Sequence, residues 1–437
     1  MSYELKLLPL QRQAEIRERW LKARLEKLLP ALMKETGIDM WLVYSQESNE
    51  DPVMKTLLPP PMVSSLRRTL LLFFLQDDGK LEMLSLGRPG SALDKVYKSV
   101  WTNQVDSDWT VYAALVPNAK ITTEHESPPE TQMECLKRHI DQRAPRKIGL
   151  NFSKNTAYGD GLSYGMYSMI AEGIGAENLS KIVSAESLCV RWLETRLPEE
   201  IEAYTGIATC TAQLVREALS PAVTHPGVTT ATDLERYTMR RGTELGLKPW
   251  FPHTATIRRN GGSLSGEEVI LGGDIVHIDI GLEYLGLCTD LQVNAYVLKL
   301  GEVKPPQGIV DLFEQGKRLQ NITTEEMALG KSGNDVLVSS LKRAENEGIK
   351  AMIYSHPIGT HGHAAGTSIG LVDNQKFLKF SGEGLINDNT CYALELHVVG
   401  SIPECDGKHL ILALETNIVY TSGKVEYFYR QDELFII

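Results

Sequence analysis

The sequence predicts an α/β (α+β) fold in two domains. The chain has 437 residues, which is more than a single hydrophobic core usually supports, so two domains are expected. Helix-like and strand-like segments alternate through the first half, as they do in α/β domains. In the second half, apolar β-branched runs lie between segments with helix signals, which indicates strands framed by helices.

One long helix and three strands are expected in the first half. Residues 16–35 carry apolar side chains at helical spacing and predict an amphipathic helix, which Pro30 kinks or ends. The strands are expected at residues 40–44, 69–75 and 147–150, which are apolar and rich in strand-forming residues.

The domain junction is expected between residues 185 and 198, so that the domains span residues 1–185 and 190–437. Pro198 followed by glutamates favours a helix start, because proline suits the first helical position and acidic groups suit the first turn. Thr232-x-x-Glu235 matches a capping box and predicts a second helix start. The helices expected in this domain cover residues 199–219, from 232 onward, 309–329 and 334–347.

Two aspartates, Asp279 and Asp290, are eleven residues apart in the second half. They belong to two apolar runs, residues 275–280 and 291–298, which a glycine-containing segment joins and which suit a hairpin. With residues 284–285 as the loop, the two aspartates lie directly opposite each other, with Cβ atoms about 5 Å apart.

Two carboxylates at that separation repel each other strongly unless cations lie between them. The alternative is a pair of strand ends in solvent. The apolar flanks favour a buried hairpin, and a buried aspartate needs a partner. The pair is therefore a candidate metal site.

Three histidines, His356, His361 and His363, lie within eight residues of a glycine-rich segment. The glycines allow close approach of the backbone to a bound group. Three histidines can also bind one zinc ion by themselves, but spacings of five and two residues match no common zinc motif.

Glu395 and Glu415 each interrupt an apolar, strand-like run. Exposed strand faces alternate polar and apolar residues, and these runs do not. A glutamate in such a run is expected to be paired or bound to a metal. Residues 403–408 read as a loop between the two runs, so the two strands are expected to be neighbours.

These residues occur in the order Asp, Asp, His, Glu, Glu. The first two are eleven residues apart, His356-Pro-Ile-Gly359 contains the histidine, and His363 follows seven residues on. This pattern resembles the M24 metallopeptidases, the pita-bread family of methionine aminopeptidase, aminopeptidase P and prolidase. Residues 16–43 are similar to the start of the creatinase/aminopeptidase P amino-terminal domain. Residues 196–202 resemble the segment that opens the catalytic domain of the family.

The resemblance implies a creatinase-like amino-terminal α/β domain followed by a pita-bread catalytic domain with a curved, mainly antiparallel sheet. The additional first domain fits the aminopeptidase P, prolidase and creatinase branches. The implied enzyme is a metallopeptidase that hydrolyses an amino-terminal peptide bond, at Xaa-Pro, and forms a homodimer.

The resemblance also implies two divalent metal ions, with Mn²⁺ first and Co²⁺, Zn²⁺ or Fe²⁺ as alternatives. A hydroxide that bridges the ions would attack the scissile carbonyl. His363 would stabilise the oxyanion, and Glu395 would also carry a proton to the leaving amine. The implied ligands are Asp279 to one ion, His356 and Glu395 to the other, and Asp290 and Glu415 to both.

The chain departs from the family near the substrate. The family usually has a histidine some seventeen or eighteen residues before the first aspartate, but positions 261–262 are glycines. His253 and His361 are the candidate substrate-binding residues, with a structural role as the alternative for each. Leu396 and Ala413 stand where aminopeptidase P and prolidase tend to have proline and arginine.

Two rival functions remain. One is a metal-dependent hydrolase or lyase of a non-peptide substrate on the same fold. The other is a non-catalytic or metal-free pita-bread homologue, against which the five retained ligands count.

Composition and net charge restrict the kinds of partner that the protein is expected to bind. The net charge of −11 argues against nucleic acid and against an anionic membrane. No long apolar span and no signal-peptide pattern are visible in the sequence, so a cytoplasmic protein is expected. The six cysteines show no CxxC pair and are expected to be reduced thiols. Cys288, close to Asp290, is an alternative metal ligand.

Overall fold

A computed structural model describes residues 7–87, 89–102, 130–403 and 407–437. The chain divides into two compact units, and the boundary between Trp192 and Leu193 lies in α8 (Glu186–Glu194). One unit is Leu10–Trp192. The other is Leu193–Ile437 together with the described residues that precede Leu10, and the backbone N–H of Leu8 donates to the Tyr284 hydroxyl there at 2.9 Å.

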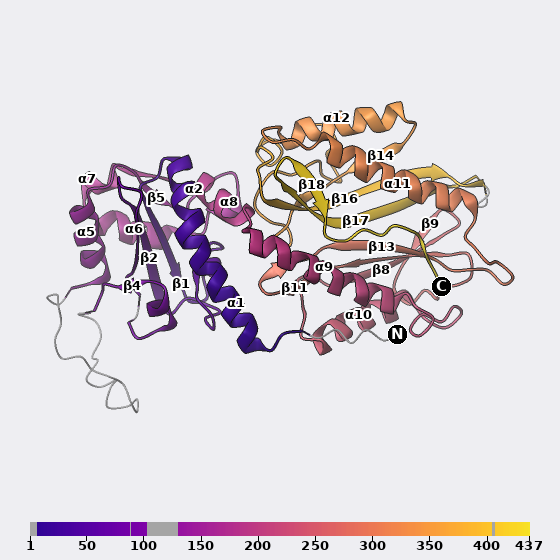
Figure 1. Cartoon of the computed structure of the whole chain (residues 1–437), viewed down its shortest axis with the longest axis horizontal. Helices are drawn as coiled ribbons and strands as arrows, with labels where there is room; N and C mark the ends of the chain where they lie inside the picture. Colours follow the sequence, from indigo (N-terminus) through magenta and orange to yellow (C-terminus); the bar gives the residue numbers. More distant parts are fainter. Residues whose placement is uncertain (1–6, 88, 103–129, 404–406) are drawn as a thin grey trace. The chain divides into compact units, whose positions relative to one another are not determined.

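The first unit contains a mixed six-stranded sheet with the order β4-β3-β2-β1-β5-β6 (Figure 1). Neighbours β1, β2 and β3 are antiparallel, whereas β5 runs parallel to β1 and to β6. The expected strands at residues 40–44, 69–75 and 147–150 are confirmed as β1, β2 and β5. The strands are β1 (Met40–Gln46), β2 (Arg68–Leu75), β3 (Leu81–Ser85), β4 (Lys98–Ser99), β5 (Ile148–Leu150) and β6 (Ile182–Ser184).

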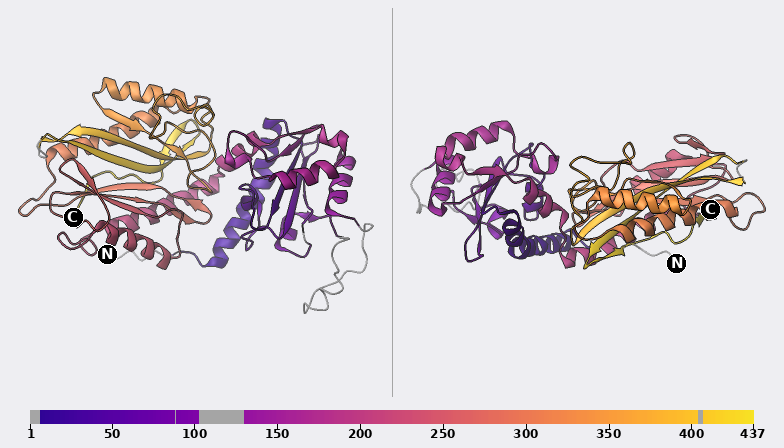
Figure 2. Two further views of the ribbon diagram at one scale, coloured as in Figure 1. Left: turned by 180° about the vertical axis from the view of Figure 1, so that it is seen from behind. Right: turned by 90° about the horizontal axis from the view of Figure 1, so that it is seen from above.

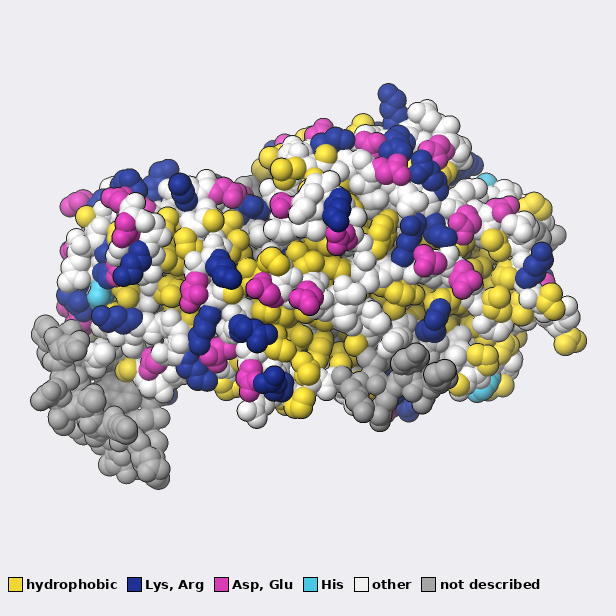
Figure 3. All heavy atoms as spheres, in the orientation of Figure 1, with side chains coloured by type: hydrophobic (Ala, Val, Ile, Leu, Met, Phe, Trp, Pro, Cys, Tyr) yellow, Lys and Arg dark blue, Asp and Glu magenta, His cyan; other side chains and the backbone are white. Residues whose placement is uncertain are grey.

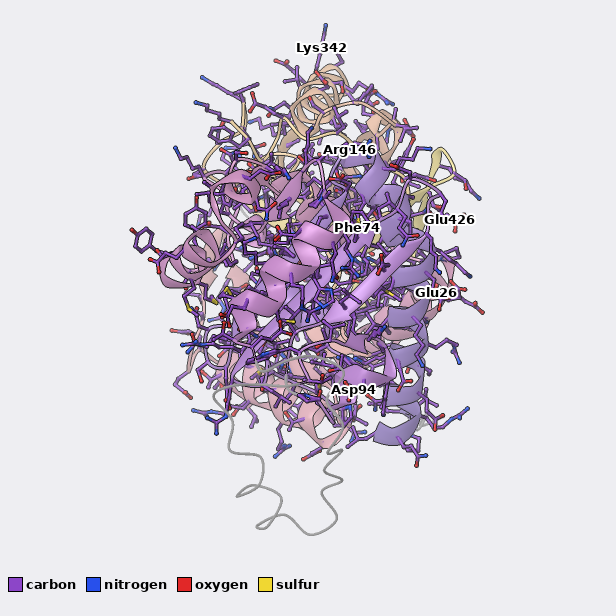
Figure 4. All side chains as sticks on the ribbon, turned by 90° about the vertical axis from the view of Figure 1, so that its left-hand side faces the viewer. Glu26, Phe74, Asp94, Arg146, Lys342 and Glu426 are labelled. Carbon is purple, nitrogen blue, oxygen red and sulfur yellow. The ribbon has the colours of Figure 1, made fainter. Side chains whose placement is uncertain are left out.

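Helices cover this sheet, and side chains of α5 (Gln132–Arg143) and α6 (Tyr164–Gly173) share a hydrophobic core with those of β1, β2 and β5. Figure 4 looks onto this unit and marks Phe74 of β2, which packs against the same core. The unit also contains two shorter helices, α3 (Met54–Leu57) and α7 (Ala176–Leu179), and a helical segment at its start.

That helical segment is longer than expected and is continuous through Pro30. It consists of α1 (Leu10–Ala23), a π-helical turn (Arg24–Leu28) and α2 (Leu29–Thr36). Pro30 is in the first turn of α2, where a proline costs little because that N–H would have no intrahelical partner. The wider π turn before it separates the two α-helical parts.

The second unit is built on a curved, mainly antiparallel ten-stranded sheet (Figure 1). Its main order is β14-β16-β17-β13-β10-β8-β9, and β15, β18 and β19 pair at its sides. A separate small sheet has the order β12-β11-β7, in which β7 is Lys248–Pro249. The strands of the large sheet are β8 (Thr254–Arg259), β9 (Gly262–Leu264), β10 (Ile275–Ile280), β13 (Leu291–Tyr296), β14 (Lys350–Ile353), β15 (His356–Pro357), β16 (Thr390–Ser401), β17 (His409–Thr421), β18 (Lys424–Tyr427) and β19 (Phe435–Ile436).

Four helices pack on this sheet: α9 (Pro198–Ala218), α10 (Ala231–Glu244), α11 (Gln307–Glu326) and α12 (Gly333–Asn346). Leu312 of α11 shares a core with Leu394 and Leu396 of β16 and with Leu412 and Leu414 of β17. Alternate residues of a strand point to opposite faces, so Glu395 and Glu415 face away from α11. Seen from behind in Figure 2, the strands of this unit face the viewer.

The expected strand runs 275–280 and 291–298 are confirmed as β10 and β13, but the expected hairpin register is wrong by two residues. The loop is Leu285–Gly286, flanked by β11 (Leu282–Tyr284) and β12 (Leu287–Cys288). Both loop residues have positive φ, 57° and 80°, as a type I′ turn requires. Asp279 therefore opposes Gln292. A two-residue shift keeps every side chain on its face.

No helix in the described parts of the chain is long and apolar enough to span a membrane. Acidic and basic side chains are interspersed over the face that Figure 3 shows. Five cysteines are described and all are free thiols, four of them buried; Cys405 lies outside the described residues.

The start of α10 differs from expectation. Thr230, not Thr232, caps the helix: its hydroxyl accepts from the Asp233 N–H at 3.1 Å, and Asp233 accepts from the Thr230 N–H at 3.0 Å. Glu235 is engaged elsewhere, because its carboxylate accepts from the Ala255 N–H of β8 at 3.1 Å. The alternative partner in the sheet explains why the predicted box does not form.

This cap gives a paired stability test. Thr230→Ala should lower the free energy of unfolding of the second unit by about 1 kcal/mol, because the Asp233 N–H in the first turn loses its acceptor. Thr232→Ala, the matched control, should change it by less than about 0.5 kcal/mol. Calorimetric melting of both variants measures the difference, and equal losses would contradict the assigned cap.

Candidate metal centre

Strand register places three carboxylates in one row across the large sheet. Asp279 of β10 opposes Gln292 of β13, Gln292 opposes Glu415 of β17, and Glu415 opposes Glu395 of β16. Directly opposed residues share a face, and adjacent strands are about 4.8 Å apart. The expected neighbourhood of the two glutamate strands is thereby confirmed, although the row puts Gln292 between the carboxylates.

Asp290 precedes β13 and is held at this row by its backbone. Its N–H donates to the Asn417 side-chain oxygen at 3.1 Å, and the Asn417 amide donates to the Asp290 carbonyl at 2.9 Å. Asn417 is two residues beyond Glu415 on β17. The paired amide contacts leave the Asp290 carboxylate to point at the site.

His356 lies on β15, where it opposes Ala393 of β16. Its Nδ1–H donates to the Pro357 carbonyl at 3.0 Å, so Nε2 carries the lone pair. Nε2 is 3.7 Å from Asp290 Oδ2 and 3.9 Å from Glu415 Oε1. Fixing Nδ1 in this way leaves Nε2 as a ready metal ligand.

The side chains form three overlapping groups, in each of which one ligand atom per residue lies within 4.8 Å of the others. Glu415 belongs to two of them, as does Asp290, so the groups join into one centre. His363 reaches the same centre through Asp290 and His356, and its ring centroid is 4.6 Å from that of His356. The groups are Asp279 with Asp290 and Glu415, His356 with Glu395 and Glu415, and Asp290 with His356 and His363.

The electrostatics of the centre are dominated by the burial of ionisable side chains that have no opposite charge beside them. Burial raises the pKa of Asp279 to about 7 and that of Glu395 to about 8, with Asp279 adding to the shift of Glu395. Burial, together with the neighbouring carboxylates, raises the pKa values of Asp290 and Glu415 well above their usual range. Burial lowers the pKa of His356 to about 4. A centre of this kind favours neutral forms until cations are present.

The donor set fits divalent cations. Asp279 Oδ1, His356 Nε2 and Glu415 Oε1 are buried and have no hydrogen-bond partner among the described residues. Buried polar atoms are nearly always satisfied, and each exception needs a reason. Oxygen-rich ligands with one imidazole suit Mn²⁺, Co²⁺, Fe²⁺ or Zn²⁺, and cations bound in these groups would satisfy all three atoms.

A polar chain behind the centre was not predicted from the sequence. The Gln292 amide N–H donates to Glu395 Oε1. The Gln292 oxygen is 3.0 Å from His277 Nε2, and His277 Nδ1 is 3.1 Å from the Thr256 hydroxyl. Burial lowers the pKa of His277 to about 4, so its neutral Nε2–H donates to Gln292. The sequence did contain a signal for this chain of contacts: Gln292 and His277 are polar residues inside otherwise apolar strands.

Trp250 forms a wall beside His363. Its indole N–H donates to the Thr289 carbonyl at 2.8 Å, and its ring meets that of His363 edge-on at 5.4 Å. A Cβ added at Gly281 or Gly362 would lie 2.2 or 2.3 Å from this indole. The two glycines are therefore needed for the rigid ring to pack close to the centre.

The remaining sequence candidates lie outside the three groups. His253 is 3% exposed, and its nitrogens contact the Thr238 hydroxyl at 3.0 Å and the Gly281 carbonyl at 3.3 Å. His361 is half-buried and near Thr360. The buried Cys288 thiol is not part of any of the groups found among the described residues, and burial raises its pKa to about 12.

Position 261 has no room for a histidine. Gly261 has φ +79°, and an added Cβ would lie 2.9 Å from Lys408 Cβ and 3.0 Å from the His409 carbonyl oxygen. The backbone conformation and the close neighbours of Gly261 therefore account for the absence of a histidine at this position.

A curved sheet that gathers carboxylates and an imidazole on one face is the arrangement of a pita-bread metal-binding domain. The model of metallopeptidase family M24 matches residues 204–422, half of the chain. The chain therefore belongs to metallopeptidase family M24. A search of curated protein sequences found no match.

Solved structures of this fold cover nearly the whole chain. An X-Pro aminopeptidase from Thermotoga maritima has a TM-score of 0.61 at 13% identity and covers 93% of this chain and 100% of its own. An Xaa-Pro dipeptidase from Bacillus anthracis has a TM-score of 0.57 at 16% identity, covering 97% and 100%. A prolidase from Pyrococcus furiosus has a TM-score of 0.56 at 13% identity, covering 92% and 100%. At these identities the likeness establishes the fold.

The raised carboxyl pKa values predict the pH dependence of stability without metal. Acids whose pKa is raised by folding hold protons in the native state that the unfolded chain releases, so stability falls as pH rises through the folded pKa. Histidines with a lowered pKa give the opposite slope, but only below about pH 6.5. With metal removed, the free energy of unfolding of the second unit should therefore fall between pH 6.5 and 8, by about 1.4 kcal/mol per pH unit for each retained proton.

Calorimetric melting at several pH values, in EDTA and in Mn²⁺, measures this pH dependence of stability. Added Mn²⁺ should raise the melting temperature most at the alkaline end, and Glu395→Gln should reduce the slope. Glu426→Gln, an exposed change on β18, should leave it unaltered. A flat profile without metal would contradict the shifts.

Proposed function

We propose that the protein is a dinuclear-metal peptidase that hydrolyses an amino-terminal peptide bond, preferentially Xaa-Pro. One observation carries the proposal: five ligand side chains meet in overlapping groups, and Asp279, His356 and Glu415 each have a buried atom there with no hydrogen-bond partner among the described residues. Membership of family M24 supports peptide hydrolysis. The similarity to proteins named X-Pro aminopeptidase, Xaa-Pro dipeptidase and prolidase supports the Xaa-Pro bond.

The ions would be held by the groups described above. Asp279 would hold one ion, His356 and Glu395 would hold the other, and Asp290 and Glu415 could contribute to both, consistent with their shared membership of the groups. Mn²⁺ is the first choice because four of the five ligands are carboxylates. Divalent ions bound in such a site supply Lewis acidity, which lowers the pKa of a water molecule and polarises a carbonyl.

Glu395 is proposed to move the proton that the leaving amine needs. Its Oε1 is fixed by Gln292, and its backbone N–H donates to the Ser355 hydroxyl at 3.0 Å, so the carboxyl is held rigidly at the edge of the centre. A carboxylate held in this position can take up a proton and return it to the leaving amine.

His363 is proposed to stabilise the oxygen of the carbonyl under attack. It is the exposed member of the centre, and the Trp250 ring limits its movement. Partial desolvation of the ring lowers its pKa, and a neutral imidazole can donate an N–H without placing a positive charge beside the metals. Preorganised donors of this kind stabilise developing negative charge.

A non-peptide substrate is the second candidate. The observation that favours it is the backbone at Gly261, one of the two positions where the family usually has a histidine, which leaves no room for that side chain. Together with Leu396 and Ala413, this changes the surroundings of the metal centre but leaves its ligands intact.

A substrate panel decides between the two. With Mn²⁺ added, the protein should hydrolyse Xaa-Pro dipeptides or longer Xaa-Pro peptides, and hydrolysis should stop when EDTA is added. Release of the first residue is followed by chromatography. No turnover of any peptide by protein shown to contain metal would reject the peptidase and favour the non-peptide substrate.

Two substitutions separate metal binding from catalysis. Asp290→Ala should abolish metal uptake and activity together, because it removes a ligand shared by both ions. His363→Ala should lower kcat by about 100-fold, as loss of an oxyanion donor typically does, while metal content remains that of the unsubstituted protein. His409→Ala, at an exposed end of β17, is the control. Metal loss in His363→Ala would show that the histidine is a ligand instead.

A further inference from the structure

The loop 356–366, which carries two histidines of the metal centre, contacts two charged side chains from the start of the second unit. A Cβ added at Gly359 would lie 3.4 Å from Arg196 Cζ, and one added at Gly366 would lie 2.8 Å from Glu194 Oε2. Both charged residues are buried, with 1% exposure for the arginine and 3% for the glutamate. The loop is therefore bounded near both ends by side chains that have little freedom to move.

Gly359 is also the point at which this loop is bonded to the segment that carries Asp290. The Gly359 carbonyl accepts from the Cys288 N–H at 2.7 Å. The preceding residue is bonded to β16, because the Ile358 N–H donates to the Cys391 carbonyl at 2.9 Å. Three segments that each contribute to the metal centre therefore meet at residues 358–359.

Arg196 lies beside this junction with donors that have no partner. Its Nη2–H donates to the Leu193 carbonyl, but Nε and Nη1 have no hydrogen-bond partner among the described residues. Glu200 Oε2 is 3.8 Å from Nη1, too far for a hydrogen bond, and it accepts from the Leu197 N–H at 2.8 Å. Buried donors are nearly always satisfied, and each exception needs a reason.

The guanidinium group turns its flat face toward Gly359. From the position of a Cβ on Gly359, Cζ of Arg196 is 3.4 Å away and Nη1 and Nη2 are each 3.6 Å away. Nearly equal distances to three atoms of a planar group occur over its face and not at its edge. Because the Leu193 carbonyl holds the group, it forms a fixed, flat surface next to the loop. Lysine has no such planar group.

We propose that Arg196 is a positioning residue for the metal centre. Its guanidinium limits the movement of Gly359. The hydrogen bond from Cys288 carries that constraint to Asp290, and the chain itself carries it to His356. Packing alone does not require a charge here, because an apolar side chain of similar length fills the space without the cost of desolvation. The proposal uses the ligands assigned under the proposed function and adds a residue outside the ligand groups.

The affinity of the full-length, metal-free protein for Mn²⁺ tests this role. Arg196→Met keeps most of the side-chain length and should raise the Kd for Mn²⁺ by about tenfold, as loss of a residue that supports metal ligands typically does. Removal of a positive charge would by itself strengthen the binding of a cation, so weaker binding reports lost positioning. Titration calorimetry measures the Kd, and an unchanged or lower Kd would overturn the proposal.

Arg24→Met is the matched control. Arg24 is also buried, donates to the Trp192 carbonyl and lies over the indole ring of Trp192 at 4.4 Å, but it belongs to the first unit. The control should leave the Mn²⁺ affinity unaltered, and an equal weakening in both variants would overturn the assignment to Arg196.

Melting of the metal-free protein distinguishes positioning from a general structural role. The melting temperature of Arg196→Met should stay within about 4 °C of that of the unsubstituted protein. A fall in melting temperature without weaker Mn²⁺ binding would make Arg196 a structural residue and overturn the proposal. If Arg196→Met does not fold, Arg196→Lys decides, because it keeps the charge and loses only the planar group. It should raise the Kd by about threefold, and an unchanged Kd would overturn the proposal.

Turnover separates failure of this proposal from failure of the peptidase proposal. With an Xaa-Pro peptide and saturating Mn²⁺, Arg196→Met should lower kcat by about tenfold with little change in KM, because His363 belongs to the displaced loop. Weaker Mn²⁺ binding in a protein that hydrolyses no peptide supports the positioning role and counts against the peptidase. Peptide hydrolysis with an unchanged kcat and Mn²⁺ affinity in Arg196→Met supports the peptidase and overturns the positioning role.

Discussion

Repulsion among four carboxylates, two of them buried and two half-buried, is the constraint on which the second unit depends. Asp279, Asp290, Glu395 and Glu415 are brought together by backbone pairing, not by attraction among their side chains. Like charges at such separations in a low-dielectric site cannot all ionise without cations. The fold therefore builds a site whose charged form is stable only with divalent ions, and metal binding and folding stability are coupled.

The large sheet tolerates the electrostatic repulsion among the carboxylates because its two faces have separate roles. The face toward α11 is apolar, with Leu312, Leu394 and Leu414 in one core. The opposite face carries the polar groups and links them in a chain from Thr256 through His277 and Gln292 to Glu395. Partners of this kind orient metal ligands and tune their basicity. Packing of the apolar face against α11 thus holds the strands in place and fixes the positions of the metal ligands on the other face.

The sequence predicted the strands and the five clustered residues, because charged residues inside apolar runs need partners and their order resembles a known family. It did not predict the register. Gly286 suggested a turn, but only the requirement for positive φ at Leu285 as well determines which two residues form it. Gln292 was missed for the same reason, since its place between Asp279 and Glu415 follows from that register. The Thr230 cap was missed because Glu235 has a tertiary partner in β8.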